Sequence, residues 1–292
     1  MNALEARGLT KTFFRTVAVN AVSLALPQGS VNVLVGANGA GKTTLLRVLL
    51  NLLAPTAGES TVLGESSRRL GPAQWRRIGF VAEETVQPAT TVGGLLDAWR
   101  ALYPTWDRDL ENKLVREFEL PLDRALKALS RGMRMKAQLL SVLPYRPELL
   151  VLDEPFGGLD PLVREQVVQG VLELVSAEGC TVLVSSHDIV EVETLADRIL
   201  WMERGALRLV EEADSLRTRF RRVEIAAPES PPPHAWAVDR LGGSVRYIDP
   251  QFDPGRLPAG ANVEPMTLRE IFLALLRQSP AGLNPSSTPL SR

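Results

Sequence analysis

Apolar and polar residues alternate in two stretches near the start of the chain, residues 4–12 and 18–26. This period-two pattern predicts two strands, each with one buried face. Residues 31–35 are apolar and rich in β-branched side chains, which predicts a short buried strand. Residues 43–53 have the apolar density of a helix. A strand and a helix are therefore separated by only a few residues, most of them small.

The middle of the chain, residues 90–143, lacks strand signals and is predicted to be rich in helices. Residues 149–152 and 181–184 are short apolar runs, with a helical pattern over residues 162–176 between them. This alternation predicts a parallel sheet with helices packed on it. Three aromatic residues of the middle stretch belong either to the core or to a surface that faces a partner: Trp99, Tyr103 and Trp106.

The pattern changes after Ala206. An alternating strand is predicted at residues 223–226, the prolines at 231–233 form a stiff linker or loop, and residues 268–276 form a closing helix. Residues 279–292 are rich in Ser and Pro and are predicted to be disordered. Four arginines before the strand form either a solvated face or a phosphate or lipid contact: Arg217, Arg219, Arg221 and Arg222.

The composition supports a globular protein, with 45% hydrophobic and 23% charged residues among 292. A formal net charge of -1 gives no electrostatic reason to expect a nucleic acid partner. The single cysteine, Cys180, lies in an apolar run, which predicts a buried thiol and a reducing compartment. With no signal sequence and no apolar stretch of about 20 residues, the chain is expected to be soluble.

The residues between the predicted strand and helix form the pattern of glycine, four residues, then Gly-Lys-Thr. Glycines let backbone N–H groups turn inward around phosphate oxygens, and the helix adds its positive N-terminus. Lys42 is expected to reach the β- and γ-phosphates, and the Thr43 hydroxyl to bind Mg²⁺. The predicted nucleotide-binding residues are Gly36, Ala37, Asn38, Gly39, Ala40, Gly41, Lys42, Thr43 and Thr44.

Two predicted strands end in polar residues. Asp153 and Glu154 stand at the end of one of these strands. Burying two carboxylates at a strand end costs free energy unless they bind a cation or take part in catalysis. Asp153 is expected to hold Mg²⁺, and Glu154 to act as the base for the attacking water. The other strand ends at His187, which is either structural or oriented to sense a γ-phosphate and the nucleophile.

With these motifs in place, the chain resembles an ATP-binding cassette (ABC) subunit over residues 1–212. The sequence Leu-Ser-Arg-Gly-Met at 129–133 is similar to the family signature LSGGQ, and closer to the LSKGM variant of drug- and antibiotic-export cassettes. The resemblance implies that Ser130 and Gly132 complete the ATP site of a partner subunit in a head-to-tail dimer. It also implies that Asp160 belongs to the family's D-loop.

Further positions follow from the same resemblance. Phe13 stands where the family places an aromatic residue on adenine, with Val19 as a second packing residue; a plain core aromatic is the alternative for Phe13. The family's glutamine loop, which binds Mg²⁺ and couples to the membrane subunit, would carry Glu83 here. A carboxylate can also bind Mg²⁺, because hard cations favour charged oxygen.

The resemblance implies an α/β fold: a P-loop NTPase core with a parallel sheet, an N-terminal antiparallel β region, a helical subdomain and a small C-terminal α+β appendage. The expected domains are residues 1–215, with the helical subdomain at about 87–143, then 216–278 and a tail at 279–292. The implied function is ATP hydrolysis that powers transport, in the export direction, through a separate membrane permease. The subunit would form a homodimer at the cytoplasmic face of the membrane.

Two other classes of function are open to a chain with these motifs. A cassette ATPase that acts on DNA or ribosomes would carry tandem cassettes or a long coiled-coil insertion, and neither is present. A regulatory module that binds ATP without turnover would not need the base, Glu154. The transported substrate cannot be read from the chain, because selectivity belongs to the permease.

Overall fold

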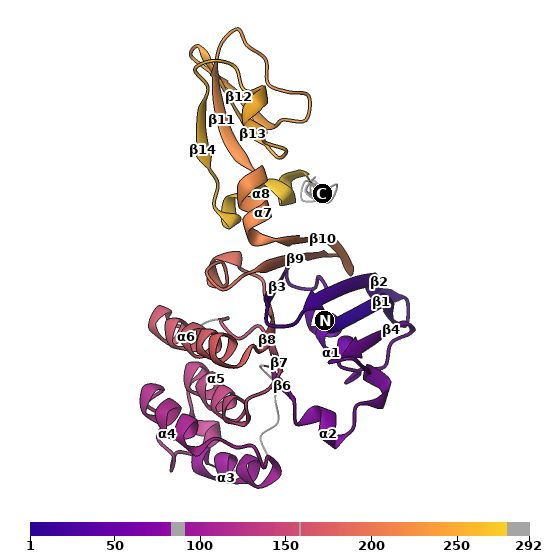
Figure 1. Ribbon diagram of the computed structural model, residues 1–292, viewed down its shortest axis with the longest axis vertical. Helices are drawn as coiled ribbons and strands as arrows, with labels where there is room; N and C mark the ends of the chain where they lie inside the picture. The colour runs from indigo at the N-terminus through magenta and orange to yellow at the C-terminus, as the bar shows by residue number, and fades with distance from the viewer. Residues whose placement is uncertain (83–90, 158, 279–292) are drawn as a thin grey trace, which may run out of the picture. The chain divides into compact units, whose positions relative to one another are not determined.

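The computed structural model describes residues 1–82, 91–157 and 159–278. Its contacts divide the chain into two compact units, Met1–Val210 and Glu211–Arg292, which are described separately. Figure 1 shows the ribbon with the element labels used below. Over the described ranges, no helix is both long enough and apolar enough to cross a membrane.

The first unit opens with an antiparallel sheet, as the alternating pattern predicts. Its strands are β1 (Asn2–Phe13), β2 (Thr16–Pro27), β4 (Ala57–Val62) and β5 (Glu65–Ser66), in the order β2-β1-β4-β5. Register shifts interrupt the pairing of β1 with β2 and with β4. Such irregularities strengthen the twist of a strand, and here they occur in the two long strands.

The second sheet of this unit has six strands in the order β10-β9-β3-β8-β7-β6. Strands β6, β7, β8, β3 and β9 pair in parallel. Because both faces of a parallel sheet are covered, its strands are apolar throughout, and every residue of β3 and β7 is buried. The strands are β3 (Val31–Val35), β6 (Ile78–Ala82), β7 (Leu149–Asp153), β8 (Thr181–Ser186), β9 (Arg198–Glu203) and β10 (Ala206–Glu212).

Helix α1 (Lys42–Leu49) lies between the two sheets and contacts strands of both. Its apolar residues Leu45, Leu46 and Val48 are buried in one core cluster with residues of β1, β2, β3 and β7. Helix α6 (Pro161–Glu178) runs along the opposite side of β7 and β8 in Figure 1. The parallel sheet is therefore covered on both faces, which is the arrangement predicted by the alternation of strands and helices.

The middle of the chain is helical, as predicted, with α3 (Val92–Leu102), α4 (Arg108–Glu117) and α5 (Arg131–Leu140). A side chain caps each helix at its N-terminus, because Thr91, Asp107 and Ser130 accept hydrogen bonds from backbone N–H groups of the first turn. The three aromatic residues of this stretch are only half-buried, and Tyr103 stacks on Tyr145 with ring centroids 3.9 Å apart.

Shorter helices connect these elements. A four-residue α-helix, α2 (Pro72–Trp75), precedes β6. The 3-10 helices are η1 (Ser67–Arg69), η2 (Leu126–Ala128), η3 (Leu143–Tyr145), η4 (Ile189–Glu191) and η5 (Pro254–Arg256).

The second unit is an α+β unit built on an antiparallel sheet in the order β12-β13-β11-β14. One cluster of buried residues lies on this sheet: Val223, Ile225, Val245 and Tyr247. Its elements are α7 (Ala213–Arg219), β11 (Arg221–Ala226), β12 (Trp236–Leu241), β13 (Ser244–Asp249), β14 (Asn262–Pro265) and α8 (Leu268–Gln278). Strand β11 and helix α8 match the predicted elements, and the other three strands were not predicted.

Three of the four clustered arginines pair with carboxylates. Arg217 Nη1 lies 3.0 Å from Asp214 Oδ1, Arg219 Nε lies 2.7 Å from Glu211 Oε1, and Arg222 Nη2 lies 2.8 Å from Glu270 Oε1. Arg221 Nη1 donates to the carbonyl oxygens of Arg217 and Phe220. These pairs neutralise charge within the unit, and the choice between a solvated face and a phosphate or lipid contact stays a prediction.

Cys180 is fully buried just before β8, as its apolar surroundings predict. Burial raises the pKa of the Cys180 thiol to about 12. The thiol is therefore protonated at neutral pH and behaves as a small apolar side chain.

Candidate functional site

The predicted phosphate loop connects β3 to α1 and packs closely against neighbouring backbone. Gly41 has a φ of 104°, and a Cβ there would lie 2.2 Å from the carbonyl oxygen of Ala18 on β2. A Cβ on Gly36 would lie 2.4 Å from the carbonyl oxygen of Met202 on β9. Both glycines are therefore required by close backbone contacts, and the loop is held between the two sheets.

Lys42, the first residue of α1, points back into the loop. Its side chain is only 5% exposed, and its Nζ donates to the carbonyl oxygens of Gly36 (2.6 Å) and Ala37 (3.2 Å). The same Nζ lies 3.0 Å from Glu154 Oε1. A buried ammonium placed inside a ring of backbone groups is suited to hold phosphate oxygens.

Asp153 ends β7 and meets the start of α1. Its Oδ1 accepts hydrogen bonds from Thr43 Oγ1 (3.1 Å) and Ser185 Oγ (2.8 Å). Thr43 and Asp153 therefore offer a hydroxyl and a carboxylate oxygen side by side, which are the hard ligands that Mg²⁺ prefers. The described residues hold no group of three or more His, Cys, Asp or Glu side chains that could bind a metal alone. Such a pair fits Mg²⁺ that takes its other ligands from phosphates and water.

Glu154, the next residue, has left-handed backbone geometry with a φ of 51°. Its backbone N–H donates to Ser185 Oγ at 3.0 Å, which holds the peptide at this turn. Burial alone would raise the pKa of the Glu154 carboxyl, but hydrogen bonds from His187 and Lys42 outweigh it and lower the pKa below its ordinary value. The side chain is therefore an ionised carboxylate at neutral pH.

His187 follows β8 and contacts the second oxygen of the same carboxylate. Its Nδ1 lies 2.8 Å from Glu154 Oε2, and its backbone N–H donates to that oxygen at 3.3 Å. The imidazole is 43% exposed, so its other edge is open to solvent. The ring is thus paired with the candidate base, and its role in catalysis stays a prediction.

Ser185 is a site residue that the motif search did not single out. Its hydroxyl links the two acids, because it donates to Asp153 and accepts from the backbone of Glu154. The available signal was the ending of β8 in two serines and a histidine, next to the strand that ends in two acids. Recognising it requires the pairing of β7 with β8, in which Asp153 is opposite Ser185.

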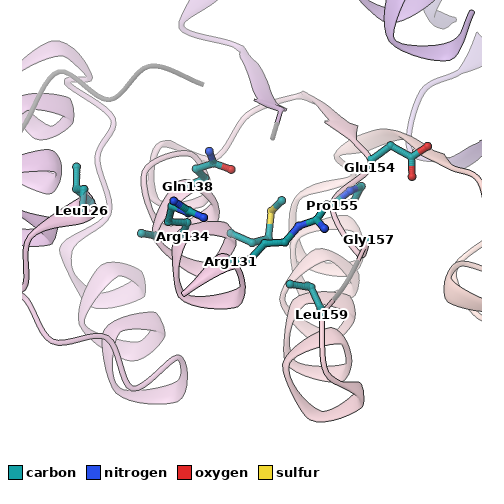
Figure 2. A pocket seen from close by; sticks show the side chains of 10 residues that line it. Leu126, Arg131, Arg134, Gln138, Glu154, Pro155, Gly157 and Leu159 are labelled. Carbon is teal, nitrogen blue, oxygen red and sulfur yellow. The ribbon is translucent and has the colours of Figure 1, made fainter. Parts of the chain in front are cut away.

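A cavity of about 320 Å³ opens beside Glu154. Residues of α5 line one side, and the segment after Glu154 lines the other (Figure 2). In Figure 2 the Arg131 side chain extends from α5 toward Pro155 and Gly157. Glu154 therefore lines this cavity, while its carboxylate points away from α5 in Figure 2 and contacts Lys42 of the phosphate loop.

The other predicted residues lie on separate elements. Ser130 and Gly132 stand at the exposed start of α5, where Ser130 Oγ accepts from the N–H of Met133 at 3.2 Å. Asp160 caps α6, with its Oδ1 accepting from the N–H of Val163 at 3.0 Å. These three residues therefore sit at or beside helix N-termini outside the cluster of Lys42 and its partners.

The two predicted adenine contacts differ in exposure. Phe13, at the end of β1, is 43% exposed and has Lys11 Nζ 5.1 Å from its ring centroid. Val19 is fully buried in the core between the sheets, so its side chain has no surface to offer a base. Phe13 is a partly exposed ring and not a core aromatic.

The remaining predicted residues are divided between surface and interior. Of the phosphate loop, Asn38 and Gly39 are exposed, Ala40 is buried, and Thr44 on α1 is half-buried. Glu83, the predicted third Mg²⁺ ligand, lies outside the described residues.

Known proteins resemble this chain in sequence and in fold. A family model described as ABC transporter matches residues 19–157. The chain is 31% identical over 227 residues to the lantibiotic transport ATP-binding protein SrtF of Streptococcus pyogenes, an alignment covering 72% of this chain and 91% of that protein. It is 36% identical over 209 residues to the daunorubicin/doxorubicin resistance ATP-binding protein DrrA of Streptomyces peucetius, covering 70% and 63%.

Solved structures share the fold. An ATP-binding subunit of an ABC transporter superposes with a TM-score of 0.66 at 24% identity, covering 74% of this chain and 92% of that one. The dimeric post-hydrolysis structure of the ATP-binding cassette MJ0796 with ADP and Pi gives a TM-score of 0.63 at 23% identity, covering 72% and 98%. These likenesses confirm the predicted α/β P-loop fold. The chain belongs to the family of ABC transporter ATP-binding proteins.

Proposed function

We propose that this chain is the ATP-hydrolysing subunit of an ABC exporter, which works as a dimer and drives a separate membrane permease. The main support for ATP hydrolysis is the position of the Glu154 carboxylate, which lies 3.0 Å from Lys42 Nζ and 2.8 Å from His187 Nδ1. A base, a phosphate-binding ammonium and a histidine thus meet at the ends of neighbouring strands. This is the arrangement that positions water for attack on a phosphoryl group.

The proposed chemistry begins at the phosphate loop. The β- and γ-phosphates of ATP lie against the loop's backbone N–H groups and compete with Glu154 for the Lys42 ammonium. Mg²⁺, held by Thr43 and Asp153, would neutralise charge on the phosphates. The contact of Thr43 Oγ1 with Asp153 Oδ1 at 3.1 Å supports this pair of ligands.

Glu154 then accepts the proton of the attacking water. Its lowered pKa keeps it ionised before attack, and losing Lys42 to the phosphates removes one of the contacts that lowers it. The carboxylate therefore becomes a better base when ATP is in place. His187 holds the carboxylate in position and presents its exposed edge to the γ-phosphate.

A second copy of the chain completes the site in this proposal. Ser130 and Gly132 are at the exposed start of α5, where helix N–H groups favour anionic oxygens. They would contact the ATP bound by the partner, with Asp160 beside them and Phe13 stacking on adenine. ATP would then join the two copies, and hydrolysis would release them.

The export direction rests on the relatives. DrrA is named for drug resistance and SrtF for lantibiotic transport, while other relatives at 31–32% identity are named as import proteins. The LSRGM signature, closer to the export variant, favours the first group. In this proposal residues 1–215 form the ATPase domain, 216–278 an accessory domain, and the subunit binds the cytoplasmic face of the membrane through its permease.

Glu154→Gln tests the catalytic assignment. The amide keeps the shape of the side chain but removes the base, so ATP binding should persist while turnover falls about 10²-fold or more. Glu148→Gln is the matched control, because Glu148 precedes the same strand but pairs with Arg77. Steady-state ATPase assays and gel filtration with ATP should show an inactive dimer for the first variant. Turnover that matches the control would remove Glu154 as the base.

A pull-down from membranes tests the partner. The tagged Glu154→Gln variant, loaded with ATP, should recover a polytopic membrane protein. Recovery of ribosomes or DNA would contradict the transporter proposal and favour a non-transport ATPase.

A further inference from the structure

The start of α5 lies against the loop that follows Glu154. A methyl group built on Gly132 would lie 3.5 Å from Val163 Cγ1 and 3.7 Å from Leu159 Cδ2. Both of those residues come shortly after the Glu154 loop, residues 154–157. Helix α5, which carries the signature motif, therefore packs within one chain on the segment that follows Glu154.

Arg131 approaches the Glu154 loop from α5. A Cβ built on Gly157 would lie 3.3 Å from Arg131 Nη2 and 3.9 Å from His187 Cε1. Gly157 thus stands between the guanidinium and the imidazole that holds Glu154. Figure 2 shows the Arg131 side chain reaching from α5 to this loop, where it lines the same cavity as Glu154.

The position of Arg131 is electrostatically unusual for a cation. It is the first residue of α5, and the first turn of that helix has no acidic residue. The positive end of the helix dipole disfavours a cation at this position. The helix itself therefore gives no electrostatic reason for an arginine here. Its guanidinium leaves the helix end and extends across to the Glu154 loop.

We propose that Arg131 is a positioning residue for the Glu154 loop of its own chain. Two neighbouring residues at the N-terminus of α5 then serve two different ATP sites. Ser130 contacts the nucleotide bound by the partner, and Arg131 supports the carboxylate that acts on the nucleotide bound by its own chain. This inference rests on the proposed function for its catalytic consequence. The contact itself exists within a single chain and can be tested without nucleotide.

Arg131→Ala tests both aspects. Hydrogen–deuterium exchange of the nucleotide-free protein should become faster in the peptide that contains Phe156 and Gly157. Turnover should fall about tenfold with KM within about twofold, because a loosened base affects the chemical step more than binding. Arg131→Lys should recover part of the turnover, since the ammonium keeps the charge but not the planar donor. Arg134→Ala, one turn along α5, is the matched control for loss of a cation and should change neither measurement.

Gly157→Ala provides a second, independent variant. Its methyl group would lie 3.3 Å from Arg131 Nη2 and push the guanidinium back slightly. It should therefore loosen the same contact as Arg131→Ala, to a smaller extent, and the double variant should be no worse than Arg131→Ala alone. Unchanged exchange in Arg131→Ala would overturn the inference, even if turnover falls, because Arg131 would then act on the partner's nucleotide. Absence of ATPase activity in the unmodified protein would refute the proposed function, and the exchange measurement would still decide the loop contact.

Discussion

One hydroxyl group joins the two acids of the candidate site. Ser185 Oγ donates to Asp153 Oδ1 and accepts from the backbone N–H of Glu154, and the side chain is fully buried. Asp153, the proposed metal ligand, and Glu154, the proposed base, therefore share a support from the neighbouring strand. At the scale of single residues, the site depends on this support as much as on its charged groups.

Ser185→Ala should lower both stability and turnover. It leaves a buried carboxylate and a buried N–H each without one partner, which costs about 1–3 kcal/mol of unfolding free energy. Turnover should fall about tenfold, because both acids lose a positioning contact. Ser186→Ala is the control, since its hydroxyl contacts Glu191 Oε2 at 2.7 Å and not the acids. Urea unfolding and ATPase assays measure the two effects; equal turnover in both variants would contradict the role of Ser185.

The residues that could be predicted from sequence are those in local motifs. Lys42 and Glu154 each stand in a short pattern whose chemistry is specific, and the structure brings them within 3.0 Å. Ser185 and Arg131 reach the site through strand pairing and helix packing, which bring together residues far apart in the chain. For Val19 the family resemblance implied a contact with adenine. Its side chain lies on the buried face of β2 and is fully buried, so the structure does not support that contact.

At the scale of elements, the helical region has a cap that also carries an ion pair. Asp107 begins α4, where its Oδ1 accepts from the N–H groups of Asp109 and Leu110 at 2.9 Å. Its other oxygen accepts from Arg146 Nη2 at 2.6 Å. The hydrogen bond from Leu110 and the pairing with Arg146 lower the pKa of Asp107 below 3.8.

Asp107→Ala should destabilise the protein by about 1–2 kcal/mol at neutral pH, through loss of the cap and a partly exposed pair. Because the folded pKa is lowered, this contribution is present above pH 3.8 and is lost as pH falls through the lowered pKa. Asp107→Asn keeps a capping oxygen and should cost less than Ala. Denaturant unfolding at neutral pH and at acid pH measures the difference; a cost that does not shrink with acid would exclude the charged contact.

The apolar runs predicted three strands of the parallel sheet, β3, β7 and β8, and a helical pattern predicted α6. The other helices were predicted only as a helix-rich stretch, and β6 and β9 were not predicted as strands. Strands β12, β13 and β14 have four to six residues, and prolines and glycines interrupt the chain between them. Strands β13 and β14 pair with β11, which lies about 20 and 40 residues earlier in the chain, so no local pattern contains those pairings. Strand β12 pairs with β13 across the two-residue turn Gly242-Gly243, a local hairpin signal that the sequence analysis missed.

At the scale of the molecule, each compact unit has its own core. In the second unit, one cluster of buried residues comes from β11 and β13, and further apolar residues are buried on α7 and α8. A unit with a separate core can unfold separately, so ATP binding should depend on the first unit only.

Val223→Asp tests this independence. A charge at this fully buried position should destabilise the second unit by about 3 kcal/mol or more. ATP affinity should be unchanged, and calorimetry should show two transitions of which one shifts. Val238→Asp is the control, because Val238 on β12 is 42% exposed. Loss of ATP affinity in Val223→Asp alone would mean that the units fold together.

The buried thiol of Cys180 has a practical consequence. It is the chain's one cysteine, and with its pKa raised to about 12 it does not react with maleimides at neutral pH. No native cysteine therefore has to be replaced before a cysteine is introduced for site-specific labelling. A cysteine placed at an exposed position such as Leu162 would carry the one spin label of each chain. Label-to-label distances could then follow ATP-dependent pairing of two copies without further substitution.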